Sequence, residues 1–339
     1  MIIVLKPKSS EEQVQEVAQA VKKFGYEPRI IRGVELTVIA AVGDERSHHT
    51  LESLTVLPQV DHVTAVQKRY KLVSRDFHKA DTTVRVGDVP IGPGHFHVIA
   101  GPCSVESERQ TLEVARAVQA AGAMLLRGGA FKPRTSPYDF SGLGKEGLSI
   151  LKKARQETGL PIVTEVMSPQ DVEAVSDYAD MLQIGTRNAQ NFALLHAAGQ
   201  SRKPVFLKRG MSATVEEWLN AAEHIAAQGN SHIILCERGI RTFETSTRFT
   251  LDLNSVAVAK KETHLPVFVD PSHGVGRADL IVPLARAAVA VGADGLMIEV
   301  HPDPKKALSD GSQQMTPDRF GELMKALRPF VELMGRTLG

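Results

Sequence analysis

The stretch PVFLKRGMSATVEEWLNAAEHIAAQGNSHIILCERG, residues 204–239, contains two short apolar runs separated by a segment with helical spacing. PVFLKRG and HIILCERG are continuous apolar runs that end in charged residues, as expected for strands buried on both faces. Between them, Thr214 precedes apolar residues that recur with the period of a helix. The stretch therefore predicts one strand–helix–strand unit with parallel strands.

The same alternation extends from residue 96 to the end of the chain. The apolar runs are FHVIAGPCS, MLLRGGA, IVTEVM, MLQIGT, PVFLKRG, HIILCERG, PVFVDPSH and GLMIEVH. Helix candidates begin near Glu106, Gly144, Ser168, Gln190, Thr214, Asp252, Ala278 and Thr316. Eightfold alternation predicts an α/β fold, a (β/α)8 (TIM) barrel over residues 96–339. An open doubly wound sheet is the competing arrangement, but GPCSVE after the first strand lacks a GxGxxG phosphate fingerprint.

Residues 1–70 follow a different order of elements. An apolar strand, MIIVLK, is followed by a helix beginning at SSEE, two strands around Gly33, a second helix in HTLESLTVLPQV and a last strand, DHVTAVQKRY. This βαββαβ order predicts a small ferredoxin-like domain. Residues 71–95 are expected to be a polar linker followed by a short hairpin that turns at Gly87-Asp88.

The composition limits the classes of function. The 339 residues are 42% hydrophobic and carry a net charge of +1, which gives no general attraction to nucleic acid or membrane. No apolar run is long enough to span a bilayer and the first residues lack the features of a signal peptide, so we expect a cytoplasmic protein. Cys103 and Cys236 are expected to be reduced.

Ionisable residues cluster where the predicted strands end, which is the active-site face of a barrel. One subset, at the ends of the first, seventh and eighth strands and in the loop that follows, offers one sulfur, one imidazole and two carboxylates: Cys103, His273, Glu299 and Asp310. These groups could bind a divalent transition metal, although a free cysteine is more often a small buried apolar residue.

A second subset at the same strand ends is basic. It comprises Arg127, Lys132, Arg134, Arg187, Lys208 and Arg238. Arginine and lysine bind phosphate and carboxylate groups, so this concentration in a chain of near-zero net charge predicts multiply anionic substrates. The alternative is that each base pairs with a neighbouring carboxylate across the barrel.

Six strings in this part of the chain carry a resemblance to a known family. They are GPCSVE at 101–106, LLRGGAFKPRTSPYDF at 125–140, GTRNAQN at 185–191, LKRG at 207–210, CERG at 236–239 and DPSHG at 270–274. Together with EVHPDP, they closely resemble 3-deoxy-D-arabino-heptulosonate 7-phosphate (DAHP) synthases with an N-terminal ferredoxin-like regulatory domain. The resemblance covers essentially the whole chain.

The resemblance implies a transferase that condenses phosphoenolpyruvate with erythrose 4-phosphate and water to DAHP and phosphate, the first step of the shikimate pathway to the aromatic amino acids. It implies one divalent metal ion per subunit (Mn, Fe, Co, Zn or Cu) on Cys103, His273, Glu299 and Asp310. Phosphoenolpyruvate would contact Arg127, Lys132, Glu165, Arg187, Lys208 and Arg238, and the sugar phosphate would contact Arg134, Thr135 and Ser136. Lys132 is a candidate proton donor, and Glu299 or Asp310 could activate water.

Other functions remain open at this point. The nearest relative, 3-deoxy-D-manno-octulosonate 8-phosphate synthase, uses arabinose 5-phosphate on the same barrel, but KPRTS at 132–136 argues against it. A Schiff-base aldolase would use Lys208 or Lys132 as its nucleophile. A barrel without activity is a third reading, but none of the expected ligands or bases is missing. Cys236 is expected to be a packed strand residue, with an oxidised pairing to Cys103 as the alternative.

The first seventy residues lack a cluster of catalytic groups, so we expect them to serve in regulation or assembly. The resemblance implies feedback inhibition by tyrosine or phenylalanine bound at this domain, and a homo-oligomer, a dimer or tetramer. A purely structural role in assembly is the alternative. His48 and His49 are adjacent in a polar segment, and no site is assigned to them.

Overall fold

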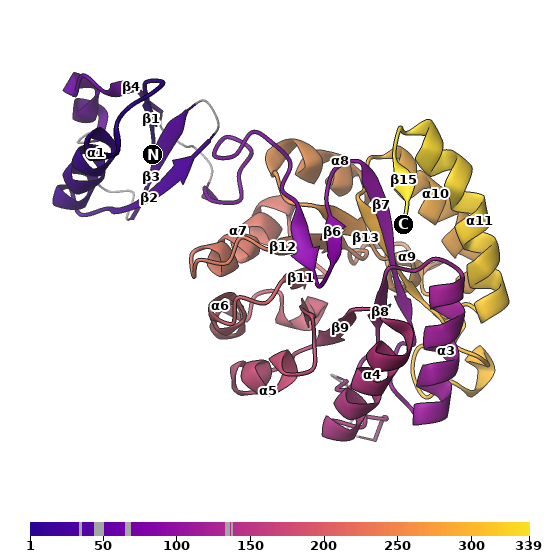
Figure 1. Cartoon of the computed structure of the whole chain (residues 1–339). Helices are drawn as coiled ribbons and strands as arrows, with labels where there is room; N and C mark the ends of the chain where they lie inside the picture. Colours follow the sequence, from indigo (N-terminus) through magenta and orange to yellow (C-terminus); the bar gives the residue numbers. More distant parts are fainter. Residues whose placement is uncertain (34–35, 44–50, 65–68, 133–135, 137) are drawn as a thin grey trace. The chain divides into compact units, whose positions relative to one another are not determined.

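The computed structural model describes the chain except for residues 34–35, 44–50, 65–68, 133–135 and 137 (Figure 1). The chain divides into two compact units, Met1–Lys79 and Ala80–Gly339. None of the described helices is both long enough and apolar enough to cross a membrane.

The N-terminal unit is an antiparallel sheet with one long helix. Its strands are β1 (Ile2–Leu5), β2 (Glu27–Arg32), β3 (Thr37–Val42) and β4 (Val60–Thr64), in the order β2-β3-β1-β4. Helix α1 (Glu11–Lys23) begins at Ser10, whose side chain accepts from the backbone of Gln13 in a capping box. The predicted ferredoxin-like arrangement is confirmed. In the described part of the second predicted helix, the chain forms a 3-10 helix, η2 (Glu52–Val56).

The second unit is a closed barrel of parallel strands, as predicted. The strands are β7 (His95–Gly101), β8 (Leu125–Arg127), β9 (Ile162–Glu165), β10 (Met181–Ile184), β11 (Val205–Lys208), β12 (Ile233–Glu237), β13 (Val267–Val269) and β14 (Gly295–Glu299). Each strand pairs in parallel with the next, and β14 pairs with β7 to close the barrel. All eight strands coincide with the apolar runs of the sequence.

Helices surround the strands of the barrel (Figure 1). They are α3 (Glu108–Ala120), α4 (Lys145–Thr158), α5 (Val172–Ser176), α6 (Phe192–Gln200), α7 (Val215–Ala226), α8 (Leu253–Glu262), α9 (Pro271–Val275), α10 (Ile281–Ala290) and α11 (Pro317–Leu333). Short 3-10 turns are η3 (Pro169–Asp171), η4 (Thr186–Asn188), η5 (Ala278–Leu280), η6 (Pro304–Lys306) and η7 (Gly311–Gln313). Helix α9 follows β13 directly, so His273 lies on a helical turn that Asp270 caps rather than on the strand.

Two small elements accompany the barrel. Strands β5 (Val84–Val86) and β6 (Val89–Ile91) form an antiparallel hairpin, and their apolar residues join the core inside the barrel. Strand β15 (Thr337–Leu338) pairs with the start of β7. The barrel core includes Phe206 and Phe268, whose rings meet edge to face with centroids 5.7 Å apart.

We expect the same substitution to have opposite effects at two glycines of this unit. A Cβ atom on Gly295 would lie 2.3 Å from both the carbonyl oxygen of His97 and the ring of Phe268, whereas one on Gly321 in α11 would meet open space. Gly295→Ala should lower the free energy of unfolding by about 1–3 kcal/mol, because the core and the β7–β14 ladder must shift. Gly321→Ala should raise it by about 0.5–1 kcal/mol, because alanine favours a helix.

Urea unfolding followed by circular dichroism measures both changes. A Gly295→Ala protein as stable as the wild type would contradict the close approach of β7, β13 and β14 at this point.

Candidate active site

A cavity of about 290 Å³ lies at the carboxyl ends of the barrel strands. Its walls come from strand ends and from the loops that follow them. The lining residues are Arg127, Lys132, Asp139, Glu165, Gln183, Gly185, Thr186, Arg187, Lys208, Met211, Arg238, Arg248, Phe249, His273 and Asp310. Most of them are charged or polar, so the cavity suits a polar, charged ligand.

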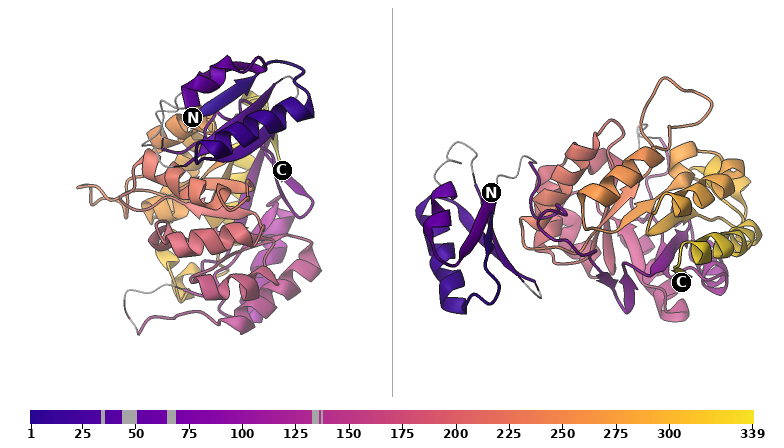
Figure 2. Two further views of the ribbon diagram at one scale, coloured as in Figure 1. Left: turned by 90° about the vertical axis from the view of Figure 1, so that its left-hand side faces the viewer. Right: turned by 90° about the horizontal axis from the view of Figure 1, so that it is seen from above.

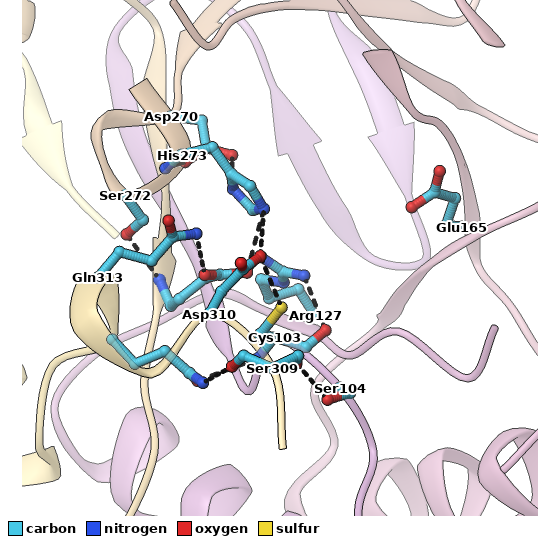
Figure 3. Close-up of polar contacts among 12 residues, drawn as sticks. Cys103, Ser104, Arg127, Glu165, Asp270, Ser272, His273, Ser309, Asp310 and Gln313 are labelled. Carbon is cyan, nitrogen blue, oxygen red and sulfur yellow. Dashed lines mark hydrogen bonds and ion pairs between the residues drawn. The ribbon is translucent and has the colours of Figure 1, made fainter. Parts of the chain in front are cut away.

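Beside this cavity, the structure brings together Cys103, His273, Glu299 and Asp310. One ligand atom from each residue lies within 4.8 Å of all the others (Figure 3). The Sγ atom of Cys103 is 3.5 Å from Oδ2 of Asp310, and Nε2 of His273 is 3.3 Å from Oε1 of Glu299. Sulfur, imidazole and carboxylate donors at these separations fit a divalent transition metal.

Neighbouring side chains orient two of these groups. Oδ2 of Asp270 lies 2.7 Å from Nδ1 of His273, which leaves Nε2 facing the cluster. Glu299 accepts hydrogen bonds from Arg127 at 2.6 Å and from Gln313 at 2.6 Å. Such partners fix the orientation of metal ligands in known sites.

Asp310 reaches the cluster from an unusual backbone conformation. Its φ is 49°, in the left-handed region, at the start of η7. Its loop is bound to the end of β7 by a hydrogen bond of 2.5 Å between the hydroxyls of Ser104 and Ser309, and by one of 3.1 Å from the Cys103 amide to Gln314. The loop therefore holds Asp310 and Cys103 at a set separation.

Burial and neighbouring charges together control the protonation of the cluster. Burial and the negative charge of Glu299 raise the pKa of the Cys103 thiol to about 12, and the ammonium of Lys132 donates to its sulfur at 3.0 Å. Burial opposes ionisation of Glu299, but His273 and Arg127 hold its pKa at about 2. Burial also lowers the pKa of His273, which favours the neutral imidazole that binds metals.

The basic residues fall into two groups. Arg127 and Lys208 are almost fully buried and pair with Glu299 at 2.6 Å and Asp270 at 2.5 Å. The alternative considered from the sequence, in which a base pairs with a neighbouring carboxylate, therefore applies to Arg127 and Lys208. Within the described ranges, Lys132, Arg187 and Arg238 line the cavity without a carboxylate within 4.0 Å.

The remaining predicted residues are placed as follows. Glu165 lines the cavity at the end of β9, apart from the ligand cluster (Figure 3). Ser136 is partly buried and its hydroxyl accepts from the amide of Tyr138. Arg134 and Thr135 lie outside the described residues, as do His48 and His49. Cys236 is a free thiol in the barrel core, and burial raises its pKa.

Sequence reasoning missed several residues of the cavity wall. Arg248 bonds to Asp310 at 3.1 Å and to Gln313 at 2.9 Å, and Phe249 lines the cavity beside it. Both come from the loop between β12 and α8, ten or more residues beyond the strand end, where no motif marks them. Gln183 was also missed because it lies inside an apolar strand.

Fold and site together define an enzyme of the (β/α)8 class with a cationic pocket beside a mixed sulfur, nitrogen and oxygen ligand cluster. The pattern of the DAHP synthetase I family matches residues 64–333, and that of the DAHP synthase ferredoxin-like domain matches residues 1–68. The chain belongs to the DAHP synthetase I family and carries the ferredoxin-like domain found in DAHP synthases.

Two relatives match over 99% and 72% of the chain. A phospho-2-dehydro-3-deoxyheptonate aldolase of Thermotoga maritima is 50% identical over 335 residues, 99% of each chain. A 2-dehydro-3-deoxyphosphooctonate aldolase of Syntrophotalea carbinolica is 39% identical over 72% of this chain and 94% of its own.

Two solved structures are also similar. The crystal structure of the Thermotoga maritima DAHP synthase superposes with a TM-score of 0.80 at 49% identity, covering 100% of this chain and 99% of that one. A truncated form of DAHP synthase from the same organism gives a TM-score of 0.74 at 50% identity, covering 79% of this chain and 98% of that one.

We expect the metal-free protein to lose stability in acid, in part through Glu299. The fold lowers the pKa of this carboxyl from 4.5 to about 2, so the ionised group stabilises the fold above pH 4.5 and this contribution is lost as the pH falls toward 2. One such group changes the free energy of unfolding by at most about 1.4 kcal/mol per pH unit. Between pH 5 and 3.5, urea titrations should therefore give a shallower pH dependence for Glu299→Gln than for the wild type.

Glu165→Gln is the matched control, because Glu165 lines the same cavity without joining the cluster. Its urea titrations over the same pH range provide the reference for removing a cavity carboxylate that lies outside the cluster. Equal slopes for Glu299→Gln and the wild type would show that the Glu299 carboxyl is not held ionised by the fold.

Proposed function

We propose that the protein condenses phosphoenolpyruvate with erythrose 4-phosphate and water to give DAHP and inorganic phosphate, the first step of the shikimate pathway. The observation that carries the proposal is the 50% identity to a DAHP aldolase along 99% of both chains, including the N-terminal unit. The cationic cavity supports it, because both substrates are phosphorylated.

Phosphoenolpyruvate would bind among the bases of the cavity. Its phosphate would contact Arg187, Lys208 and Arg238, and its carboxylate would face Arg127 and Lys132, with Glu165 beside them. Asp270 already holds Lys208 at 2.5 Å, so a phosphate would share this ammonium with the carboxylate. Arg187 is exposed and Arg238 has no carboxylate partner among the described residues, so both have donors available for the anion.

The second substrate would be held through its own phosphate by the loop after β8. Arg134, Thr135 and Ser136 are the proposed contacts, and of these only Ser136 is among the described residues. Asp139, from the same loop, lines the cavity and could contact sugar hydroxyls.

Cys103, His273, Glu299 and Asp310 are the proposed ligands of one divalent metal ion, such as Mn, Fe, Co, Zn or Cu, and their donor atoms and spacing fit such an ion. When bound, the ion would supply Lewis-acid chemistry at the sugar aldehyde. The Cys103 thiol must release its proton to serve as a ligand.

The bonds that form and break in the condensation indicate which groups of the chain would transfer protons. The C3 carbon of phosphoenolpyruvate forms a bond to the aldehyde carbon, water adds to C2, and phosphate leaves when the C2–O bond breaks. The aldehyde oxygen gains a proton, for which Lys132 is the proposed donor because it lines the cavity. The water loses a proton, and Asp310, which lines the cavity, is better placed to accept it than the fully buried Glu299.

The two alternative activities would require a different substrate or a different catalytic group. An octulosonate 8-phosphate synthase would accept arabinose 5-phosphate, and the 2-dehydro-3-deoxyphosphooctonate aldolase of Syntrophotalea carbinolica matches 72% of this chain, against 99% for the Thermotoga maritima relative. A Schiff-base aldolase would need a lysine nucleophile, but Lys208 is held by Asp270 and Lys132 donates to Cys103.

We expect chelator-stripped protein to leave phosphoenolpyruvate unconsumed when erythrose 4-phosphate is added, and added manganese to restore consumption. The reason is that the ligand cluster lies at the edge of the substrate cavity, with His273 and Asp310 in the cavity wall. The measurement is the loss of phosphoenolpyruvate absorbance, with arabinose 5-phosphate as a parallel acceptor. Cys103→Ala should abolish the rescue at equal manganese.

Full activity without metal would overturn the assignment of the four ligands. Consumption of phosphoenolpyruvate with arabinose 5-phosphate alone would identify the activity as that of an octulosonate 8-phosphate synthase. Inactivation by borohydride in the presence of substrate, together with activity in chelator, would indicate the Schiff-base aldolase.

The N-terminal unit is proposed to be regulatory. Ferredoxin-like domains of this kind accompany DAHP synthases, and the described part of this one has its own apolar core. We propose that tyrosine or phenylalanine binds at this unit in a homo-oligomer, a dimer or tetramer, and inhibits the barrel. A cytoplasmic location is part of the same proposal.

We expect tyrosine or phenylalanine to inhibit the full chain and to raise its melting temperature, because a ligand that binds only the folded state stabilises that state. The control is a chain that begins at Ala80, since a truncated relative has been solved in folded form. This control should be active and insensitive to both amino acids. Inhibition that persists in the truncated chain would place the effector on the barrel instead.

A further inference from the structure

Arg238 is a buried cation that lacks a carboxylate partner in the described part of the chain. Its exposed fraction is 5%, its Nε has no hydrogen-bond partner, and its Nη1 donates weakly to Gly239 O at 3.5 Å. An uncompensated buried charge is costly, so its retention in the wall of the cavity needs a physical reason.

The carboxylates near Arg238 are already engaged. Glu237 accepts from Arg209 at 2.9 Å and from the amide of Gly239 at 2.6 Å. Asp270 accepts from Lys208 at 2.5 Å and lies 2.7 Å from Nδ1 of His273. Neither carboxylate forms an ion pair with the guanidinium of Arg238, although both lie near enough to act on its charge.

Instead of a carboxylate, an uncharged aromatic ring contacts the guanidinium of Arg238. The guanidinium carbon of Arg238 lies 4.1 Å from the centre of the Phe249 ring, and Phe249 lines the same cavity. The face of an aromatic ring attracts a cation without accepting the hydrogen bonds that its N–H groups make in their own plane. The ring can therefore stabilise Arg238 and leave its donors to another group.

The loop that carries Phe249 is a hairpin with a projecting tip (Figure 2). Ile240 and Thr250 exchange two backbone hydrogen bonds of 2.9 and 3.0 Å. At the tip, Phe243 is 98% exposed. The returning arm is bound to α9 through a hydrogen bond of 3.0 Å from the Arg248 amide to Val275 O.

Glycines permit this arm to approach closely. A Cβ atom on Gly239, whose φ is +91°, would lie 2.7 Å from the Cβ of Phe249. A Cβ on Gly276 would lie 2.6 Å from the Cβ of Arg248. Because positions 239 and 276 lack a side chain, the backbone on both sides of the arm packs closely against it and fixes the position of Phe249.

We propose that Phe249 is a positioning residue, whose ring holds the Arg238 guanidinium in place and keeps its donors free for a phosphate group of the substrate. The inference rests on the proposed function, because that function assigns a phosphate to Arg238. It adds a residue from outside the strand ends, and it gives a reason why Arg238 has no carboxylate partner among the described residues.

The test measures binding of phosphoenolpyruvate and of inorganic phosphate to the full chain by calorimetry. Phe249→Leu keeps an apolar side chain but removes the ring face, and should weaken both affinities by about 3- to 30-fold. In steady-state assays it should raise KM for phosphoenolpyruvate while kcat and KM for the sugar phosphate change little. Phe249→Tyr should restore wild-type affinity, because it restores the ring.

Phe243→Ala, in the exposed tip of the same hairpin, is the matched control and should bind as the wild type does. Melting temperatures verify folding, and Phe249→Met provides a second ring-free variant. Wild-type affinity in both ring-free variants would overturn the inference, whereas Arg238→Ala would still weaken binding. If Arg238→Ala left the affinities for phosphoenolpyruvate and inorganic phosphate unchanged, the proposed binding of phosphate by Arg238 would be overturned instead.

Discussion

The pairing of β14 with β7 is the constraint on which the site depends. Five residue pairs close the barrel, from Gly295 opposite His97 to Glu299 opposite Gly101. This register places the carboxylate of Glu299 next to the chain that continues to Cys103, although the two residues belong to the last and first strands. A shift by one residue would turn Glu299 to the other face of the sheet, away from Arg127 and the thiol. The proposed metal ligands come from distant parts of the sequence, and they therefore meet only because the barrel closes in this register.

Burial of charge explains how the rim is organised. In the described structure, Arg127–Glu299, Lys208–Asp270 and Arg209–Glu237 are pairs whose side chains are at most 5% exposed. Such pairs are costly to break, because the remaining partner would be a buried, uncompensated charge. After these pairings, the free bases of the cavity wall provide a local positive surplus, while the chain as a whole is close to neutral. The charge that attracts an anion is therefore a property of the fold and not of the composition.

The sequence could predict what depends on local pattern. The eight strands were predictable because each is a short apolar run, and the places of Lys208, at the end of β11, and Arg238, directly after β12, follow from those runs. Asp310 was found through its motif, but the left-handed backbone and the Ser104–Ser309 contact that bring it to the cluster depend on tertiary structure. Phe249 could not be found, because its contact with Arg238 arises from a hairpin that returns to α9, and neither periodicity nor spacing encodes that return.

The metal-type cluster and the cationic cavity are coupled through Lys132. This residue lines the cavity and also donates to the sulfur of Cys103 at 3.0 Å, so its charge acts on both. Burial and Glu299 raise the pKa of the thiol to about 12, and the same carboxylate belongs to the proposed ligand set. The negative groups that disfavour a bare thiolate would therefore favour a divalent cation, which replaces the thiol proton with a larger positive charge. Lys132 holds a positive charge beside the same sulfur and in the cavity wall, so the proposed proton donor and the proposed metal ligands form one electrostatic unit.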